Sequence, residues 1–382
     1  MKNNLLTPGP TNVPPEVLLE MAKPMIHHRT REFEEIFASV RNALKGVFGT
    51  ERDVIILSGS GTLAMEAALV NTLSTNDTVL VINGGKFGER WYEIARAYSL
   101  QPIVMNVEWG KSANVEDILE EIKKHPSIKA ILIQSSETST TTYHPVKDIG
   151  LALKAMDGPL LIVDGITSVG VNETEMDAWG IDVMLTGSQK ALMLPPGLSF
   201  IAMSERAENA IKNSNLPKYY LDLKKELKAQ RTNTTAYTPA ISLIVGLKKS
   251  LELIYKEGLD NVYKRHNTMA LATRSAISAL GLELLCKGIP SNAATGIIFK
   301  DNITKSIISY AKSTLGVHFA GGQGHLNNNV IRISHMGYHY YQDVLAGISA
   351  LELSIHNVYK SIKLGTGIAV AEKIISDSLN EK

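Results

Sequence analysis

Lys190 lies in the middle of an apolar run, "DVMLTGSQKALMLPPGLSF", which spans residues 182–200. Burying an ammonium group in such a setting is costly unless the group is paired or loses its proton. Either the lysine stem extends to water, or the amine takes part in chemistry. Burial lowers the pKa of a lysine and leaves a neutral amine that can act as a nucleophile or a base.

Three other groups of residues follow apolar runs and offer matching chemistry. "LSGSGTLAMEAAL" places Ser60, Gly61 and Thr62 before a helix, where backbone N–H groups bind phosphate well, or where they form a tight turn capped by Thr62. It is not a Walker loop, because no Gly-Lys-Ser/Thr follows. "LLIVDGITSVG" places Asp164 as a turn aspartate or as the partner of a buried cation. "INGGKFGERW" places Phe87 as a core aromatic or as a stacking face.

The elements that must position these residues alternate along the chain. Helical patterns separate the apolar runs, which predicts an α/β fold with a mostly parallel sheet flanked by helices. Ligands of such sheets bind at the carboxyl ends of the strands. We expect strands within residues 53–58, 77–84, 101–107, 128–135, 159–165, 182–188 and 198–204, and helices within 61–73, 89–100, 115–125 and 148–156.

The pattern changes after about residue 258. A long helix over 261–280, strands over 295–300 and 329–334, and a closing helix over 340–362 predict a smaller α+β domain. The chain therefore divides into an N-terminal arm (1–20), a large domain (21–258) and a small C-terminal domain (259–382).

Composition limits the classes of function. The chain has 382 residues, a net charge of +1 and no basic cluster, which argues against nucleic-acid and membrane-surface partners. Cys286 is the single cysteine, so an internal disulfide and a multi-cysteine metal site are excluded, and no metal is expected. One thiol fits a reducing compartment, and the N-terminus has too few apolar residues for a signal peptide, which together predict a cytoplasmic protein.

A lysine, a strand-end aspartate, a phosphate-binding turn and an aromatic face together suit pyridoxal 5′-phosphate. At this point the sequence resembles the class V aminotransferases of fold type I, and within them the serine–pyruvate and alanine–glyoxylate aminotransferases. The motifs that carry the resemblance are "TPGPTNVPPEVL", "HHRTREF", "SGSGTLAMEAAL", "NGGKFGER", "ETSTTTYHP", "VDGITSVGV", "GSQKALMLPPG" and "VIRISHMGY", in the family's order.

The resemblance implies a role for each position. Lys190 resembles the lysine that carries the cofactor, and Asp164 the residue that holds the pyridinium proton. Phe87 takes the place of the stacking aromatic, a tryptophan in the animal enzymes, and Arg332 resembles the arginine that forks onto the substrate carboxylate. The remaining cofactor contacts implied are the phosphate-binding Ser60, Gly61, Thr62 and Gln189, the ring-contacting Thr138, and, from a neighbouring subunit, Thr235 and Thr238.

The implied reaction is ping-pong transamination in a homodimer with active sites at the subunit interface. A small amino acid, serine or alanine, gives its amino group, and glyoxylate or pyruvate receives it. The segment 233–240 departs from the family's Thr-Pro-aromatic-Thr-Pro pattern, so Thr235 and Thr238 are both candidates.

Other interpretations stay open. A broader enzyme would also accept aspartate or another acidic amino acid, and would want a second cation, for which His27, His28 and Arg29 are the candidates. A cysteine desulfurase would need a mobile cysteine, whereas Cys286 is predicted on a strand of the small domain. A non-catalytic scaffold would not need Lys190, Asp164 and Arg332 together.

Overall fold

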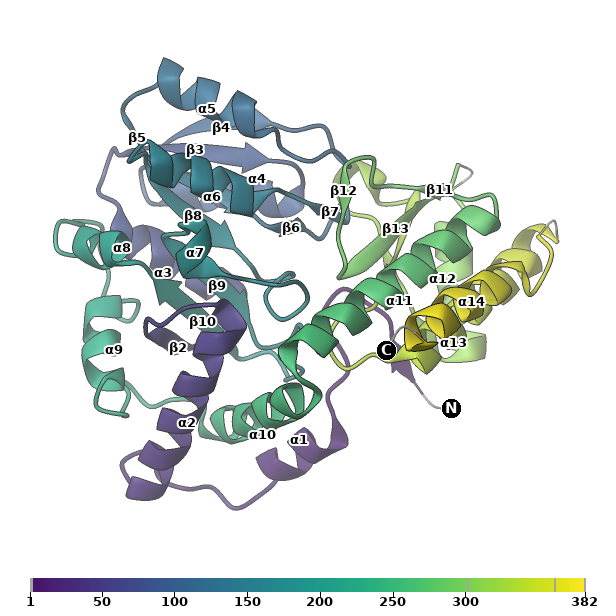
Figure 1. The fold of residues 1–382 in the computed structure, drawn as a ribbon, viewed down its shortest axis with the longest axis horizontal. Helices are drawn as coiled ribbons and strands as arrows, with labels where there is room; N and C mark the ends of the chain where they lie inside the picture. The colour runs from purple at the N-terminus through teal and green to yellow at the C-terminus, as the bar shows by residue number, and fades with distance from the viewer. Residues whose placement is uncertain (1–2, 301, 361, 381–382) are drawn as a thin grey trace.

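The computed structural model describes residues 3–300, 302–360 and 362–380, and Figure 1 shows its fold. Residues 1–2 of the predicted arm and residues 381–382 of the predicted small domain lie outside the described residues. Within the described ranges, no helix is long and apolar enough to cross a membrane.

A seven-stranded sheet forms the centre of the larger part of the molecule. Its order is β2 (Val54–Ser58), β10 (Leu198–Met203), β9 (Val183–Gly187), β8 (Leu160–Asp164), β5 (Ile128–Gln134), β3 (Thr78–Asn83) and β4 (Gln101–Asn106). The pairs from β9 to β4 are parallel, whereas β10 runs antiparallel to both β9 and β2. The predicted fold class, with a mostly parallel sheet, is confirmed.

Helices cover both faces of this sheet, because both faces of its strands are apolar. In β2, Ile55 and Leu57 face one core, whereas Val54 and Ile56 face the other. The first core is closed by α3 (Gly61–Thr72), α4 (Lys86–Ala97), α8 (Glu205–Ala210) and α9 (Leu223–Gln230). The second is closed by α1 (Pro15–Met21), α2 (Arg31–Phe48), α5 (Val115–Lys124), α6 (Val146–Ala155), α7 (Met176–Trp179) and α10 (Ile241–Glu257).

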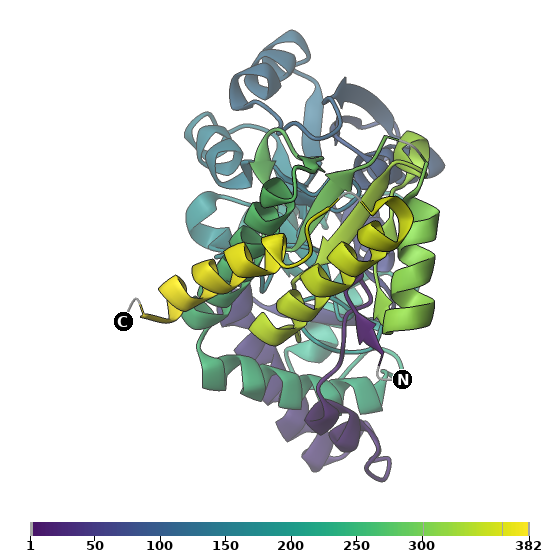
Figure 2. The same ribbon diagram turned by 90° about the vertical axis from the view of Figure 1, so that its right-hand side faces the viewer.

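The C-terminal part has its own antiparallel sheet, in the order β11 (Glu283–Leu284), β13 (Ala294–Ile298), β16 (Val330–Ser334) and β15 (Ala320–Gly321). Its helices are α11 (Leu259–Ala279), α12 (Thr304–Leu315), α13 (Tyr341–Tyr359), α14 (Thr366–Asn380) and the 3₁₀ turn η1 (Gly324–Leu326). α14 was not predicted from the sequence; it packs along α11, as Figure 2 shows in yellow and green. The boundary near residue 258 stays a prediction.

A three-stranded sheet of β12 (Ile289–Pro290), β7 (Thr142–Tyr143) and β6 (Ser136–Glu137) joins segments from both parts of the chain. Cys286 lies between β11 and β12, so its predicted place on a strand is wrong. The apolar run "LELLC" predicts one strand, but β11 ends at Leu284 and the chain bends at Leu285.

The N-terminal segment, residues 4–12, runs from the C-terminal part toward the large sheet (Figure 2). Its strand β1 (Asn4–Leu5) pairs in parallel with β14 (Val317–His318). The N–H of Ser334 donates to the Leu6 carbonyl at 2.8 Å, and His339 Nε2 lies 2.8 Å from the Leu5 carbonyl. The segment is thus fixed to the C-terminal sheet before it reaches the rest of the molecule.

Candidate active site

Lys190 and Asp164 follow neighbouring strands of the large sheet. Asp164 is the last residue of β8 and pairs with Leu185 of β9, while Lys190 lies in the turn that follows β9. Both side chains are buried, with 8% of Lys190 and 4% of Asp164 exposed. The amine and the carboxylate are therefore held in one enclosed region at the carboxyl ends of parallel strands.

Burial shifts both groups toward their neutral forms. It lowers the pKa of Lys190 to about 8, and the charge of Asp164 opposes this shift. It raises the pKa of Asp164 to about 7, and a hydrogen bond from the Ile166 N–H, 2.8 Å from Oδ1, opposes that shift. A cationic ring nitrogen beside Asp164 would favour its ionised form. Both residues therefore fit a pyridine cofactor.

The N-terminal segment covers the lysine. Lys190 Nζ donates to the Pro8 carbonyl, and Thr11 Oγ1 donates to the Lys190 carbonyl at 3.0 Å. Gly9 has a φ of +112°, and a Cβ there would lie 2.6 Å from Lys190 Cε and 2.9 Å from Cδ. A glycine is therefore required where the segment passes over the lysine side chain.

Groups suited to binding an anion lie at the start of α3. The first N–H groups of a helix have no intrahelical partner, and the Ser60 side chain makes no capping bond to them. Among the described residues the buried Gln189 Oε1 has no hydrogen-bond partner, and a half-turn of this amide would present Nε2 instead. A Cβ on Gly187 would lie 2.9 Å from Gln189 Oε1 and 3.4 Å from the Gly61 nitrogen. Glycine at position 187 thus avoids crowding two residues predicted to bind phosphate, Gln189 and Gly61.

Phe87 lies in the first turn of α4 and is partly buried. Arg90, one helical turn later, lies with its Cζ 4.8 Å from the centroid of the Phe87 ring, and its Nη1 donates to Thr62 Oγ1 at 3.3 Å. One face of the ring is thus in contact with Arg90, so only the other face is free for stacking. Arg90 also joins the predicted stacking ring to the predicted phosphate site.

Arg332 comes from β16 of the C-terminal sheet and reaches the loop after β5. Its Nη1 donates to the Thr138 carbonyl at 2.9 Å and its Nε to the Gly321 carbonyl at 2.9 Å. Nη2 has no hydrogen-bond partner among residues 3–300, 302–360 and 362–380. Burial lowers the pKa of Arg332 to about 10, and the charge of Glu137 opposes this shift. The free Nη2 edge can receive a carboxylate.

Thr138 is held through both its backbone carbonyl and its side-chain hydroxyl. Its Oγ1 lies 2.7 Å from Thr167 Oγ1, in the turn after β8 that also follows Asp164. The whole hydroxyl run of residues 135–142 is buried. Each of these hydroxyls must therefore find a partner inside the protein.

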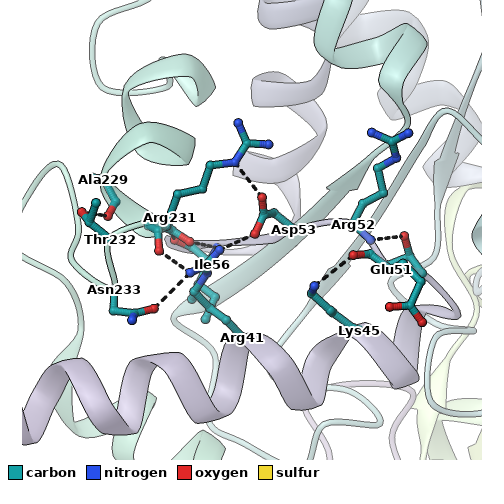
Figure 3. Close-up of polar contacts among 12 residues, drawn as sticks. Arg41, Lys45, Glu51, Arg52, Asp53, Ile56, Ala229, Arg231, Thr232 and Asn233 are labelled. Carbon is teal, nitrogen blue, oxygen red and sulfur yellow. Dashed lines mark hydrogen bonds and ion pairs between the residues drawn. The ribbon is translucent and has the colours of Figure 1, made fainter.

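Thr235 and Thr238 lie apart from Lys190, beside the end of β2. The Thr235 hydroxyl donates to the Tyr237 carbonyl at 2.6 Å, whereas Thr238 is exposed. Figure 3 shows how the preceding turn is held: Asp53 binds Arg41 at 2.5 Å and Arg231 at 2.8 Å. Within the described residues no hydrogen bond joins either threonine to Lys190, and their contact with the phosphate of a partner subunit stays a prediction.

Sequence reasoning missed three parts of this site. Arg90 follows Phe87 by three residues, a spacing that places two helical side chains on one face, so this signal was available. Glu137 and the contact of Pro8 with Lys190 depend on segments far apart in the chain and left no local pattern. The candidate cations His27 and Arg29 are exposed in the turn before α2.

Comparisons with known proteins agree with this geometry. Residues 4–344 match the family described as aminotransferase class-V. The chain is 40% identical to a "Soluble hydrogenase, small subunit" of Synechococcus, covering 98% of this chain and 99% of that protein. It is 34% identical to an L-aspartate–glyoxylate aminotransferase of Paracoccus denitrificans (97% and 96%), and 33% identical to a serine–glyoxylate aminotransferase of Methylorubrum extorquens (99% and 97%).

Among solved structures, an aspartate aminotransferase of subgroup IV from Thermus thermophilus superposes with a TM-score of 0.87 at 34% identity, covering 93% of this chain and 100% of that one. The expected family is confirmed, and with it the cofactor and the general reaction. The chain belongs to the class V aminotransferases, which use pyridoxal 5′-phosphate for transamination.

Proposed function

We propose that this aminotransferase transfers the amino group of a small L-amino acid, serine or alanine, to glyoxylate or pyruvate in a ping-pong reaction. The observation that carries the proposal is the guanidinium of Arg332, whose free Nη2 edge lies in the same enclosed region as Lys190 and Asp164. The free Nη2 group of one guanidinium matches the single α-carboxylate of such a donor. The serine–glyoxylate relative supports this choice.

Each residue then has a task. Bound pyridoxal phosphate supplies a carbonyl for the amino group and a ring that accepts electrons from the donor Cα. Arg332 binds the donor carboxylate and so orients the Cα–H bond toward Lys190. Because its pKa is lowered to about 8, the Lys190 amine is neutral in part near neutral pH and can take the Cα proton. Asp164 holds the ring nitrogen in its protonated form.

A panel of donors and acceptors tests the substrate proposal. Serine or alanine with glyoxylate or pyruvate should give a higher kcat/KM than aspartate or glutamate with 2-oxoglutarate. If glutamate were the best donor, the proposal would have to be withdrawn. A separate absorbance measurement distinguishes an enzyme from a scaffold. Bound cofactor should absorb at about 410–430 nm and lose this band when borohydride is added.

An acidic donor is the second candidate, and Arg90 favours it. Arg90 forms no ion pair within the described part of the chain, yet its charge lowers the pKa of Lys190, so it lies near the amine. A second cation there could bind the distal carboxylate of aspartate. Aspartate is a substrate named for the aspartate–glyoxylate relative. If this candidate holds, Arg90→Met should raise KM for aspartate and leave KM for alanine nearly unchanged.

Replacing Arg332 by lysine should raise KM for the amino donor, because an ammonium cannot reproduce the planar fork. Losing one charge-assisted hydrogen bond, about 1.5–3 kcal/mol, predicts a ten- to hundredfold fall in kcat/KM. Steady-state kinetics with alanine and glyoxylate measure both values. An unchanged KM would remove Arg332 from carboxylate binding.

We also propose a homodimer in which the segment of Thr235 and Thr238 reaches the phosphate of the partner subunit. The exposed Thr238 next to the exposed rings of Tyr219 and Tyr220 supports this contact. Sedimentation should show a dimer, and a fully active monomer would contradict the shared site. A cytoplasmic location, inferred from the sequence, stays part of this proposal.

A further inference from the structure

Glu137 is a carboxylate with no exposed surface, one residue before Thr138. Hydrogen-bond donors surround both of its oxygens. The N–H groups of Phe87 and Gly88 donate to Oε2 at 3.1 Å each, and Gln134 Nε2 donates to the same oxygen at 2.9 Å. Ser139 donates to Oε1 through its N–H at 3.0 Å and its Oγ at 2.5 Å. Burial raises the pKa of Glu137, but the hydrogen bonds from Ser139, Gly88 and Phe87 oppose that shift and favour the carboxylate.

Two of these donors are the first-turn N–H groups of α4, which need a cap. The helix begins after Gly85, which has no side chain to accept from them. Glu137 caps the helix instead, from β6, and Ser139 Oγ accepts from the Lys86 N–H at 3.0 Å. A Cβ on Gly85 would lie 2.5 Å from Glu137 Cδ and 2.6 Å from Cγ. Glycine at position 85 is therefore what lets the carboxylate reach the helix.

This cap fixes the side chains that α4 presents to the active site. Phe87, whose N–H binds Glu137, carries the ring predicted to stack on the cofactor, and Arg90 lies against that ring. An anion at a helix N-terminus binds both the N–H groups and the positive end of the helix dipole. Weakening it would let the first turn of α4 move, and the ring of Phe87 with it.

We propose that Glu137 is a positioning residue, whose ionised carboxylate holds the first turn of α4 so that Phe87 stays stacked against the cofactor ring. The proposal rests on the role of Phe87 given above but not on the choice of substrate. It assigns to Glu137 an effect on cofactor binding that is exerted through Phe87 alone.

Glu137→Gln is the main variant, because the amide has the shape of a neutral carboxyl group. Its NH₂ must face either the two α4 N–H groups or the Ser139 N–H, so at least one buried donor loses its acceptor. We expect the dissociation constant of pyridoxal phosphate to rise about ten- to hundredfold, and the circular dichroism of the bound cofactor to fall. Ser139→Ala keeps the charge and both Glu137 bonds to α4 but loses the Ser139 bond to the Lys86 N–H, so it should cause a smaller change in the same direction.

A double-mutant cycle with Phe87→Leu shows whether the effect passes through the ring. If Glu137 acts by positioning Phe87, the two changes together should weaken cofactor binding little more than Phe87→Leu alone. Additive effects, or wild-type affinity in Glu137→Gln, would overturn the proposal. If Glu137 had a purely structural role, Glu137→Gln would lower the melting temperature of the cofactor-free protein, and its effect on cofactor binding would not be coupled to that of Phe87→Leu.

Gly85→Ala keeps the proposal testable if Glu137→Gln does not fold. The added methyl displaces the carboxylate from α4 while preserving its charge, and should raise the dissociation constant in the same direction. Because cofactor affinity is measured without an amino donor, a failure of the substrate proposal would not affect this outcome. Wild-type affinity in Gly85→Ala would contradict the proposal.

Discussion

Replacing Lys190 by alanine is expected to abolish transamination and to leave the chain folded. In the proposed reaction the amine is the base that takes the donor Cα proton, and the loss of a general base typically lowers a rate by about a hundred- to ten-thousandfold. The truncation removes no apolar core contact, because the amine binds the Pro8 carbonyl and not a hydrophobic cluster. Single-turnover kinetics with alanine would measure the effect.

A small primary amine added to the Lys190→Ala enzyme is the matched control. It should restore part of the proton transfer if the missing group acts as a base, and nothing if the lysine only shapes the site. Circular dichroism would confirm that the variant is folded. Near-normal transamination by the variant would remove the whole catalytic assignment.

Replacing Asp164 by alanine should lower kcat by about a thousandfold, because an electrostatic contact that stabilises developing charge is worth at least two powers of ten. The carboxylate is only 4% exposed, so solvent should compensate little for the loss of its charge. Stopped-flow absorbance during the first half-reaction would measure this loss directly.

Asp164→Asn separates charge from structure. The amide oxygen can still accept the 2.8 Å hydrogen bond from the Ile166 N–H, so the turn after β8 stays capped. If the negative charge matters, the asparagine variant should lose nearly as much activity as the alanine variant. A loss under tenfold in both would reduce Asp164 to the turn aspartate that the sequence alone also allowed.

The strand-end residues could be predicted because the α/β pattern is local. Short apolar runs and intervening helices place Thr62, Asp164 and Lys190 at the carboxyl ends of their strands, and a parallel sheet brings those ends to one edge. The same local pattern predicted the fold class, which the structure confirms. The roles of these residues stay predictions until the variants are measured.

The rest of the site depends on contacts that no local pattern encodes. Glu137 lies in a run of hydroxyls that reads as a polar loop, and it is buried only because α4 and β6 meet there. The bond between Lys190 and Pro8 joins positions 182 residues apart. α14 begins at Thr366, beyond the expected closing helix of residues 340–362, and its pattern was not interpreted as a separate helix.

The N-terminal segment has a consequence for the order of assembly during synthesis. Leu5 contacts His339, 334 positions later in the chain, so this contact cannot form until residue 339 has left the ribosome. The large sheet, with contacts closer in sequence, can close earlier. The N-terminal segment that covers Lys190 can therefore be fixed to the C-terminal sheet only after the strands that flank Lys190 have been synthesised.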